Sequence, residues 1–308
     1  MKKVILALST LFVALEANAQ QDPQYNMYQF NQMIINPAYA GSRDQLSVVA
    51  ANRQQWVGFD GAPKTTCLSL HGPIVRKNLG LGLTVVNDIM GPRNVTSIYG
   101  NVAYMLRLTS DMRLSFGLNA GYNRYQFNFD KIDWKISEAP SQLFSNQTTG
   151  ALDINGGMYL KGKQFFFGLS ASHINNPSVY TYEAGNNAAL SYRLRTHLFI
   201  SGGYSFIINE DIMFSPSTLI KLVGSGVNAD INANFFIKKV FWVGGFYRMG
   251  FGPGLLTQYY ISEKLRVGLS YDTGLMAARR LGSSFEAMFG FDFGRSTTRS
   301  KMVNPRFL

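Results

Sequence analysis

The sequence has little charge, a single cysteine and no long apolar run, and each shortage excludes a class of protein. Charged residues make up 15% of the 308 residues, whereas a soluble domain carries about 25%. No segment approaches the roughly 18 apolar residues of a spanning helix, which argues against a helical membrane protein. The one cysteine, Cys67, excludes an intrachain disulfide framework and a multi-cysteine zinc site. A hydrophobic content of 46% argues against a disordered chain, so one large, aromatic-rich domain remains.

The first residues predict export. Two lysines follow the initial methionine, an apolar stretch covers 4–15, and residues 17–19 read Ala-Asn-Ala. This is the order of charges, apolar core and small-x-small cleavage site that defines a signal peptide. We expect residues 1–19 to be removed by cleavage between Ala19 and Gln20.

Several segments alternate between apolar residues and polar or small ones, most clearly over 112–123, 227–237 and 284–293. A period of two is that of a β-strand with one apolar and one polar face. Such long strands suit a membrane barrel, in which about 9 to 11 residues cross the hydrocarbon. Sandwich strands are shorter, with about 5 to 6 residues. The polar side chains expected to face the interior are Arg113, Asn119, Asn123, Asn228, Asp230, Asn232, Asn234, Glu286 and Asp292.

Residues 45–293 offer about fourteen such strands, which predicts an all-β fold, a transmembrane antiparallel up-and-down β-barrel. Connections after even-numbered strands are short and polar, whereas those after odd-numbered strands are mostly longer, notably 128–149 and 174–195. This asymmetry is typical of outer-membrane barrels with short periplasmic turns. We therefore expect an integral protein of the cell outer membrane. The expected strand starts are Gln45, Lys64, Leu79, Val95, Met112, Gly150, Gln164, Thr196, Asp211, Val227, Lys239, Gly254, Leu265 and Gly282.

Aromatic residues gather toward the expected strand ends, where outer-membrane barrels carry girdles at the membrane interfaces. We favour this interpretation over the general enrichment of aromatics in strands. The expected girdle residues are Tyr99, Tyr104, Tyr122, Tyr125, Phe127, Trp242, Tyr247, Tyr259, Tyr260 and Tyr271.

Two segments fall outside the strand pattern. Residues 20–44 interleave polar amides with aromatics and predict either a periplasmic arm or a plug inside the barrel. Residues 294–308 form a basic C-terminal tail without acidic residues, which is either a docking segment or a frayed end.

Two motifs near the N-terminus are similar to those of a known family. The first is QDPQY at 21–25 together with NPAYAG at 36–41, and the second is RQQWVG at 53–58 followed by GAP at 61–63. Together they resemble the PorP/SprF family of outer-membrane proteins, from the type IX secretion and gliding systems of Bacteroidetes. The motif residues are candidates for contacts with partners: Asn36, Pro37, Ala38, Tyr39, Gly41, Arg53, Trp56, Gly61 and Pro63.

The resemblance implies a non-catalytic role in protein secretion. A family member would help to export a cargo, such as a gliding adhesin, or attach it to the cell surface. Its partners would be outer-membrane lipids, a secreted cargo protein with a type IX C-terminal signal, and periplasmic type IX secretion components.

A passive outer-membrane porin or uptake channel is the main alternative, because fourteen strands can enclose a lumen. An enzyme is poorly supported, and we expect no catalytic residues, cofactor or metal. The three histidines, His71, His173 and His197, lie on different strands without a shared ligand motif, and such histidines are more often structural. The basic residues are spread over turns and tail, and export removes the target, so nucleic acid is not an expected partner.

Overall fold

The computed structural model describes residues 22–74, 77–128, 130, 146–184, 188–275 and 282–293. Three short 3-10 helices precede the first strand, and no helix among these residues has the length and hydropathy to cross a bilayer. The helices are η1 (Tyr28–Phe30), η2 (Gln32–Ile34) and η3 (Pro37–Tyr39). The strands are β1 (Leu46–Gln54), β2 (Lys64–Ile74), β3 (Leu79–Met90), β4 (Arg93–Arg107), β5 (Arg113–Phe127), β6 (Gln147–Lys161), β7 (Phe165–Ser172), β8 (Ser178–Ala184), β9 (Ala188–Arg193), β10 (His197–Tyr204), β11 (Phe206–Ile207), β12 (Ile212–Val223), β13 (Gly226–Ile237), β14 (Phe241–Arg248), β15 (Gly252–Tyr260), β16 (Leu265–Asp272) and β17 (Ser284–Phe293).

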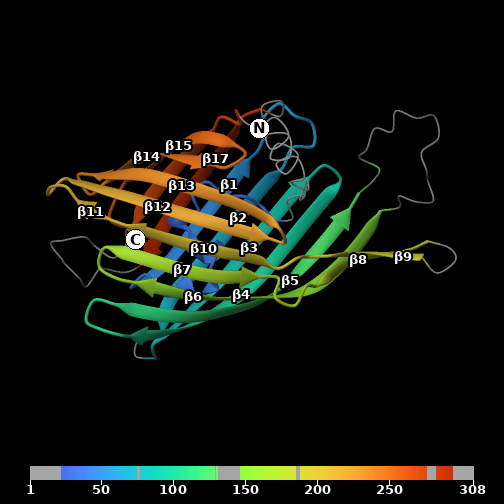
Figure 1. The fold of residues 1–308 in the computed structure, drawn as a ribbon, viewed down its shortest axis with the longest axis horizontal. Helices are drawn as coiled ribbons and strands as arrows, with labels where there is room; N and C mark the ends of the chain where they lie inside the picture. Colours follow the sequence, from blue (N-terminus) through green and yellow to red (C-terminus); the bar gives the residue numbers. More distant parts are fainter. Residues whose placement is uncertain are drawn as a thin grey trace, which may run out of the picture.

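The long strands form one antiparallel sheet that closes on itself (Figure 1). Each barrel strand pairs with the next one along the chain, and β1 pairs with β17 to complete the ring. Both β10 and the short β11 pair with β12, at adjoining positions, so β11 continues β10 as one barrel strand. The strands β8 and β9 form a separate hairpin. The barrel therefore has fourteen strands, as predicted, and each begins within three residues of its predicted start.

Alternation along the strands separates a lipid face from a lumen face. Leu118 on β5 and Leu152 on β6 are 58% and 71% exposed, whereas their neighbours Asn119 and Asp153 are 9% and 0% exposed. Closure satisfies the backbone of every strand edge, which the hydrocarbon cannot do. The predicted inward set is confirmed in its buried members, Asn119, Asn123, Asp230, Asn232, Asn234, Glu286 and Asp292, while Arg113 and Asn228 are half-buried near strand ends.

The girdle prediction is wrong for Tyr99, Tyr125 and Trp242, which point inward. Tyr125 and Trp242 are buried, and the Tyr99 hydroxyl donates to a carboxylate of the lumen wall. The reason is that the lumen holds partners for their side chains: the Trp242 ring lies 5.8 Å from that of Phe30, and the Tyr99 hydroxyl reaches Asp153. The prediction agrees with the outward exposure of Tyr104, Tyr122, Tyr247, Tyr259 and Tyr271.

The two ends of the barrel differ. The loop end carries the connections 55–63, 91–92, 128–146, 173–196, 224–225, 249–251 and 273–283. The turn end carries 75–78, 108–112, 162–164, 205–211, 238–240 and 261–264. Four loop-end connections are longer than any at the turn end, as predicted, but three are tight turns of two or three residues. The predicted signal peptide 1–19, its cleavage site at Ala19 and Gln20, and the tail 294–308 lie outside the described residues.

Candidate functional site: the N-terminal plug in the lumen

Residues 22–44, named the plug here, run through the lumen from the loop end to the turn end. Asp22 contacts His173 and His197, which flank the loop-end connection between β7 and β10. At the other extreme, Asp44 pairs with Arg113 at the start of β5. Of the two predicted possibilities for this segment, a periplasmic arm or a plug, the described residues form a plug.

Arg248, at the loop end of β14, joins the first part of the plug, residues 22–31, to the wall of the barrel. Its guanidinium donates to both carboxylate oxygens of Asp230, with Nε–Oδ1 at 2.8 Å and Nη2–Oδ2 at 2.7 Å. The same group also donates to the Gln24 side chain at 3.2 Å and to the Tyr25 carbonyl at 2.9 Å. Arg248 and Asp230 are each 4% exposed. A buried ion pair of the wall is thus completed by hydrogen bonds to the plug.

A second polar contact surrounds Asn26. The carboxylate of Glu286 accepts from the backbone N–H groups of Asn26, at 2.6 Å, and Met27, at 3.3 Å. The Asn26 amide donates to Asp272 at 3.0 Å. Arg53 lies 2.7 Å from Asp272 and 3.6 Å from Glu286. Arg53, one of the predicted motif residues, therefore balances the two carboxylates that hold the plug.

The other residues of the second motif shape the loop 55–63. Trp56 and Gly61 both have left-handed backbone angles, with φ of 47° and 74°. The Gly61 carbonyl accepts from the N–H of Gly91 at 2.9 Å, and the Pro63 carbonyl accepts from the N–H of Gln55 at 2.9 Å. Trp56, Gly61 and Pro63 thus form a turn at the loop end.

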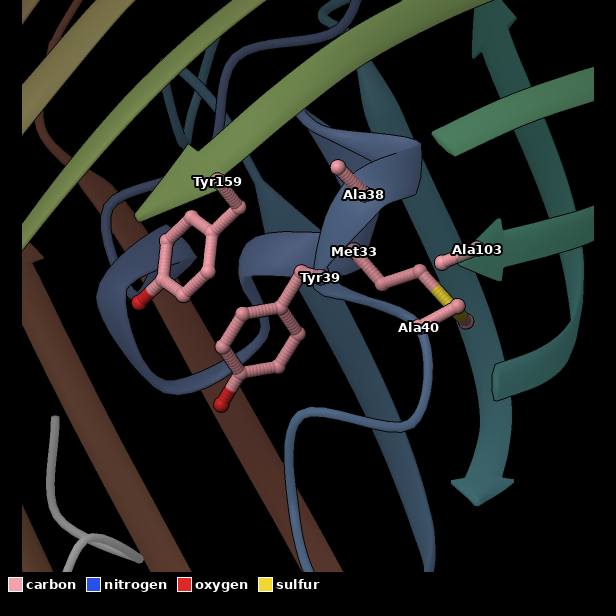
Figure 2. Close-up of a cluster of buried hydrophobic side chains, with 6 residues drawn as sticks. All are labelled: Met33, Ala38, Tyr39, Ala40, Ala103 and Tyr159. Carbon is pink, nitrogen blue, oxygen red and sulfur yellow. The ribbon is translucent and has the colours of Figure 1, made fainter. Parts of the chain in front are cut away.

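The second part of the plug, residues 32–41, is held by close apolar packing (Figure 2). The Tyr39 ring lies edge-on to the ring of Tyr159 on β6 and to the ring of His71 on β2, with centroids 5.3 Å apart in each case. The buried cluster consists of Met33, Ala38, Tyr39, Ala40, Ala103 and Tyr159. The plug and strands of the wall therefore share one small core.

Glycines in the wall make room for this part of the plug. A Cβ atom added at Gly117 on β5 would lie 2.2 Å from the backbone nitrogen of Ala38, and one at Gly80 would lie 2.1 Å from the Ala40 carbonyl oxygen. Glycine within a strand often marks such a close approach of another backbone. Three further glycines make room for side chains of the plug: Gly82 for Met33, Gly157 for Asn36 and Gly268 for Met27. The inner surface of the barrel is thus complementary to the plug.

The first motif forms the turn that fits this surface. Asn36 caps η3, because its Oδ1 accepts from the Ala38 N–H at 3.0 Å, and its Nδ2 donates to the Met158 carbonyl at 2.9 Å. Pro37 occupies the first position of η3, which suits its fixed φ. Gly41 has φ of 74° and donates its N–H to His71 Nδ1 at 3.2 Å. These residues lie inside the barrel, and their role in partner contacts stays a prediction.

The plug begins at a cluster that the sequence analysis missed. One carboxylate oxygen of Asp22 lies 2.8 Å from His173 Nε2, and the other lies 2.6 Å from His197 Nδ1. His173 Nδ1 lies 2.8 Å from Asp153 Oδ2 on β6. The signal available in the sequence was that the two histidines flank one connection between consecutive barrel strands, so the pairing of β7 with β10 brings them together.

Charge within this cluster is balanced between histidine and carboxylates. Burial lowers the pKa of His173, but Asp22 and Asp153 outweigh it and raise that pKa to about 10. Burial raises the pKa of Asp22, but the contacts with His173 and His197 outweigh it and hold the pKa well below its usual range.

A cavity of about 120 Å³ borders the cluster. Asp22 and His173 line it, together with Tyr99, Asn123 and Asn155 of the wall. A space of this size holds several water molecules, because one water needs only about 10–15 Å³. This space lies beside the plug, and its lining combines polar side chains such as Asn123 with apolar ones such as Val95.

A closed fourteen-stranded barrel with an apolar outer face and a plug seated in a polar lumen defines a plugged transmembrane β-barrel of the outer-membrane type. The sequence matches the family described as type IX secretion system membrane protein PorP/SprF over residues 17–291. The chain therefore belongs to the PorP/SprF family, as its motifs predicted.

One solved structure agrees on the fold with a TM-score above 0.5. The chain is similar to the CymD monoaromatic hydrocarbon channel, with 12% identity and a TM-score of 0.51 over 86% of this chain and 93% of that one. It is also similar to the toluene transporter TbuX of Ralstonia pickettii, with 11% identity and a TM-score of 0.49 over 84% and 92% of the two chains. The comparison with curated proteins gave no match.

Proposed function

We propose that this protein is a non-catalytic outer-membrane component of type IX secretion that assists the export or surface attachment of a cargo protein. The observation that carries the proposal is the plug, which occupies the lumen of a family member and is matched to it by the glycines of the wall. A barrel filled in this way acts as a membrane anchor and docking platform. The cargo, in this view, passes beside the barrel rather than through it.

The loop end is the proposed cargo side and the turn end the periplasmic side. The long connections 55–63, 128–146, 173–196 and 273–283 all belong to the loop end, which is the extracellular side in outer-membrane barrels. In the first of them, Val57 and Phe59 are 51% and 50% exposed, beyond the end of β1. Exposed apolar side chains on a loop suit a protein contact. Periplasmic type IX components would then meet the short turns and Asp44.

Deletion of the gene tests this role. We expect the deletion strain to keep its cargo inside the cell or shed it into the medium, and wild-type protein to restore surface display. A Val57→Ser, Phe59→Ser double variant should reach the outer membrane at normal levels but restore less display. A Val57→Ile, Phe59→Leu double variant, which keeps both exposed side chains apolar, serves as the matched control. Normal display in the deletion strain would contradict the proposal.

Conductance separates this role from that of a passive channel. The purified wild-type protein should give no steady open pore in a planar bilayer, because the plug fills the lumen. A variant that lacks residues 22–41 should conduct. Steady conductance by the wild type, with no cargo defect in the deletion strain, would favour the porin alternative.

A further inference from the structure

Asp22, His173 and His197 form a ligand set that the secretion role does not use. We propose that these three side chains bind a divalent first-row transition metal ion, with zinc as the best match. The ion would fasten the first residue of the described plug to the loop end of the barrel. This inference is independent of the cargo and of the direction of secretion.

The donor set fits such an ion. Two imidazoles and one carboxylate are a common set of protein ligands for zinc and neighbouring metals. The candidate ligand atoms of the three residues all lie within 4.8 Å of one another. With metal–ligand bonds of about 2.0–2.2 Å, a tetrahedral site holds its ligand atoms roughly 3.3–3.6 Å apart. Small side-chain rotations are enough to reach that geometry.

Asp153 orients His173 for this role. The Asp153 carboxylate lies 2.8 Å from His173 Nδ1, and because an ionised carboxylate only accepts, Nδ1 carries the proton. His173 Nε2 is then directed at Asp22, 2.8 Å away. A carboxylate behind a ligating histidine is the usual support of a zinc site. Nε2 is therefore the ring nitrogen that faces Asp22 and is available to a metal ion.

His197 supplies a nitrogen that is otherwise unused. The residue is 1% exposed, and its Nε2 has no hydrogen-bond partner among the described residues. Its Nδ1 lies 2.6 Å from the second oxygen of Asp22. A buried imidazole nitrogen without a partner is unfavourable. Either ring nitrogen of His197 is therefore available to a metal.

The neighbouring cavity completes the site. Asp22 and His173 line a space of about 120 Å³, which is large enough for a water molecule as fourth ligand. The metal would connect three segments: the start of the plug, the residue that follows β7, and the first residue of β10. Its structural effect would be to hold the plug at the loop end.

Zinc titration of the full mature protein tests the site. The protein is purified in detergent, stripped with a chelator and titrated with zinc by calorimetry, and cobalt is added separately to record its visible spectrum. We expect one zinc per chain and a cobalt spectrum typical of four nitrogen and oxygen ligands. His197→Gln and Asp22→Asn should each weaken zinc binding by at least about 100-fold, and Asp153→Asn by about 10- to 100-fold, since it supports a ligand.

His71→Gln is the matched control, because His71 is a buried lumen histidine that contacts Gly41 at the other part of the plug. Its zinc affinity should equal that of the wild type. Circular dichroism identifies variants that fail to fold. If His197→Gln does not fold, the zinc affinity of Asp22→Asn tests the site, because that change alters the plug and leaves the barrel strands intact. A folded wild type that binds no zinc, or binds it no more tightly than Asp22→Asn, overturns the proposal.

Discussion

The two parts of the plug are held in different ways. Residues 22–31 are attached through ions and amides, with Arg248 and Glu286 as the main wall partners. Residues 32–41 are attached by shape, with small plug residues against wall glycines such as Gly117. Substitution of one charged residue can break the polar contacts of the first part. The packing of the second part is disrupted when a glycine of the wall gains a side chain. The comparison predicts that substitutions of charged wall residues act mainly on the first part, and substitutions of wall glycines mainly on the second.

The largest expected effect comes from Arg248→Ala. This change leaves Asp230 buried without its ion pair and removes the hydrogen bonds to Gln24 and Tyr25. Loss of one partner of a buried pair costs about 3–5 kcal/mol, so the free energy of unfolding should fall by that amount. Urea unfolding of the wild type and the variant in lipid vesicles measures this difference in the free energy of unfolding. A loss no larger than that of an exposed arginine would show that the first part of the plug does not depend on this charge.

Gly117→Ala should have the next largest effect. The new methyl group would meet the Ala38 nitrogen at 2.2 Å, and overpacking of this kind costs about 1–3 kcal/mol. Gly100→Ala on the neighbouring strand β4 is the matched control, because its methyl group meets no atom within 4 Å. The measurement compares the free energies of unfolding of the two variants, and that of Gly117→Ala should be the lower. Equal values would mean that the plug moves freely against the wall.

Asn36→Ala tests the turn at η3, within the second part of the plug. The variant loses the cap of η3 and the hydrogen bond to Met158. Removal of a helix cap costs about 0.5–2 kcal/mol, and the same unfolding experiment should show a loss in this range. Asn52→Ala, at an exposed asparagine of β1, should show no comparable loss. An unchanged stability for Asn36→Ala would place the seating of the plug in its packing alone.

The smallest effect is expected for Arg113→Ala. Its ion pair with Asp44 is 3.1 Å long, and both side chains are more than 40% exposed. Exposed pairs contribute about 0–1 kcal/mol, less at high salt. Unfolding at low and high salt measures this contribution. A loss as large as that of Arg248→Ala would show that the turn end, and not the loop end, carries the main polar attachment.

The sequence was most informative for the barrel wall. Alternation such as that of Leu118 and Asn119 reports directly on lipid and lumen, because each strand has only two faces. Strand starts and the ring order followed from the same period. The inward turn of Trp242 could not be read in this way, because its partner Phe30 comes from a segment without a period.

The interior depended on contacts between distant parts of the chain. Arg53 and the 36–41 motif were identified from a resemblance, but nothing in their spacing indicates that Arg53 lies beside Asp272 and Glu286. For the cluster of Asp22, His173 and His197, the sequence shows only that the two histidines flank one connection, and Asp22 joins them because the plug lies in the lumen. Wall glycines are visible in the sequence, but which of them face a plug depends on where the plug lies.

The order of the chain gives the plug a part in assembly. Asn26 bonds to Glu286, 260 residues later, and the strand that carries Glu286 also closes the barrel against β1. Wall glycines leave no clearance for the plug to slide in afterwards. The strands must therefore wrap around the plug as the seam between β1 and β17 forms. On this view the N-terminal segment is enclosed when the barrel closes, rather than inserted afterwards.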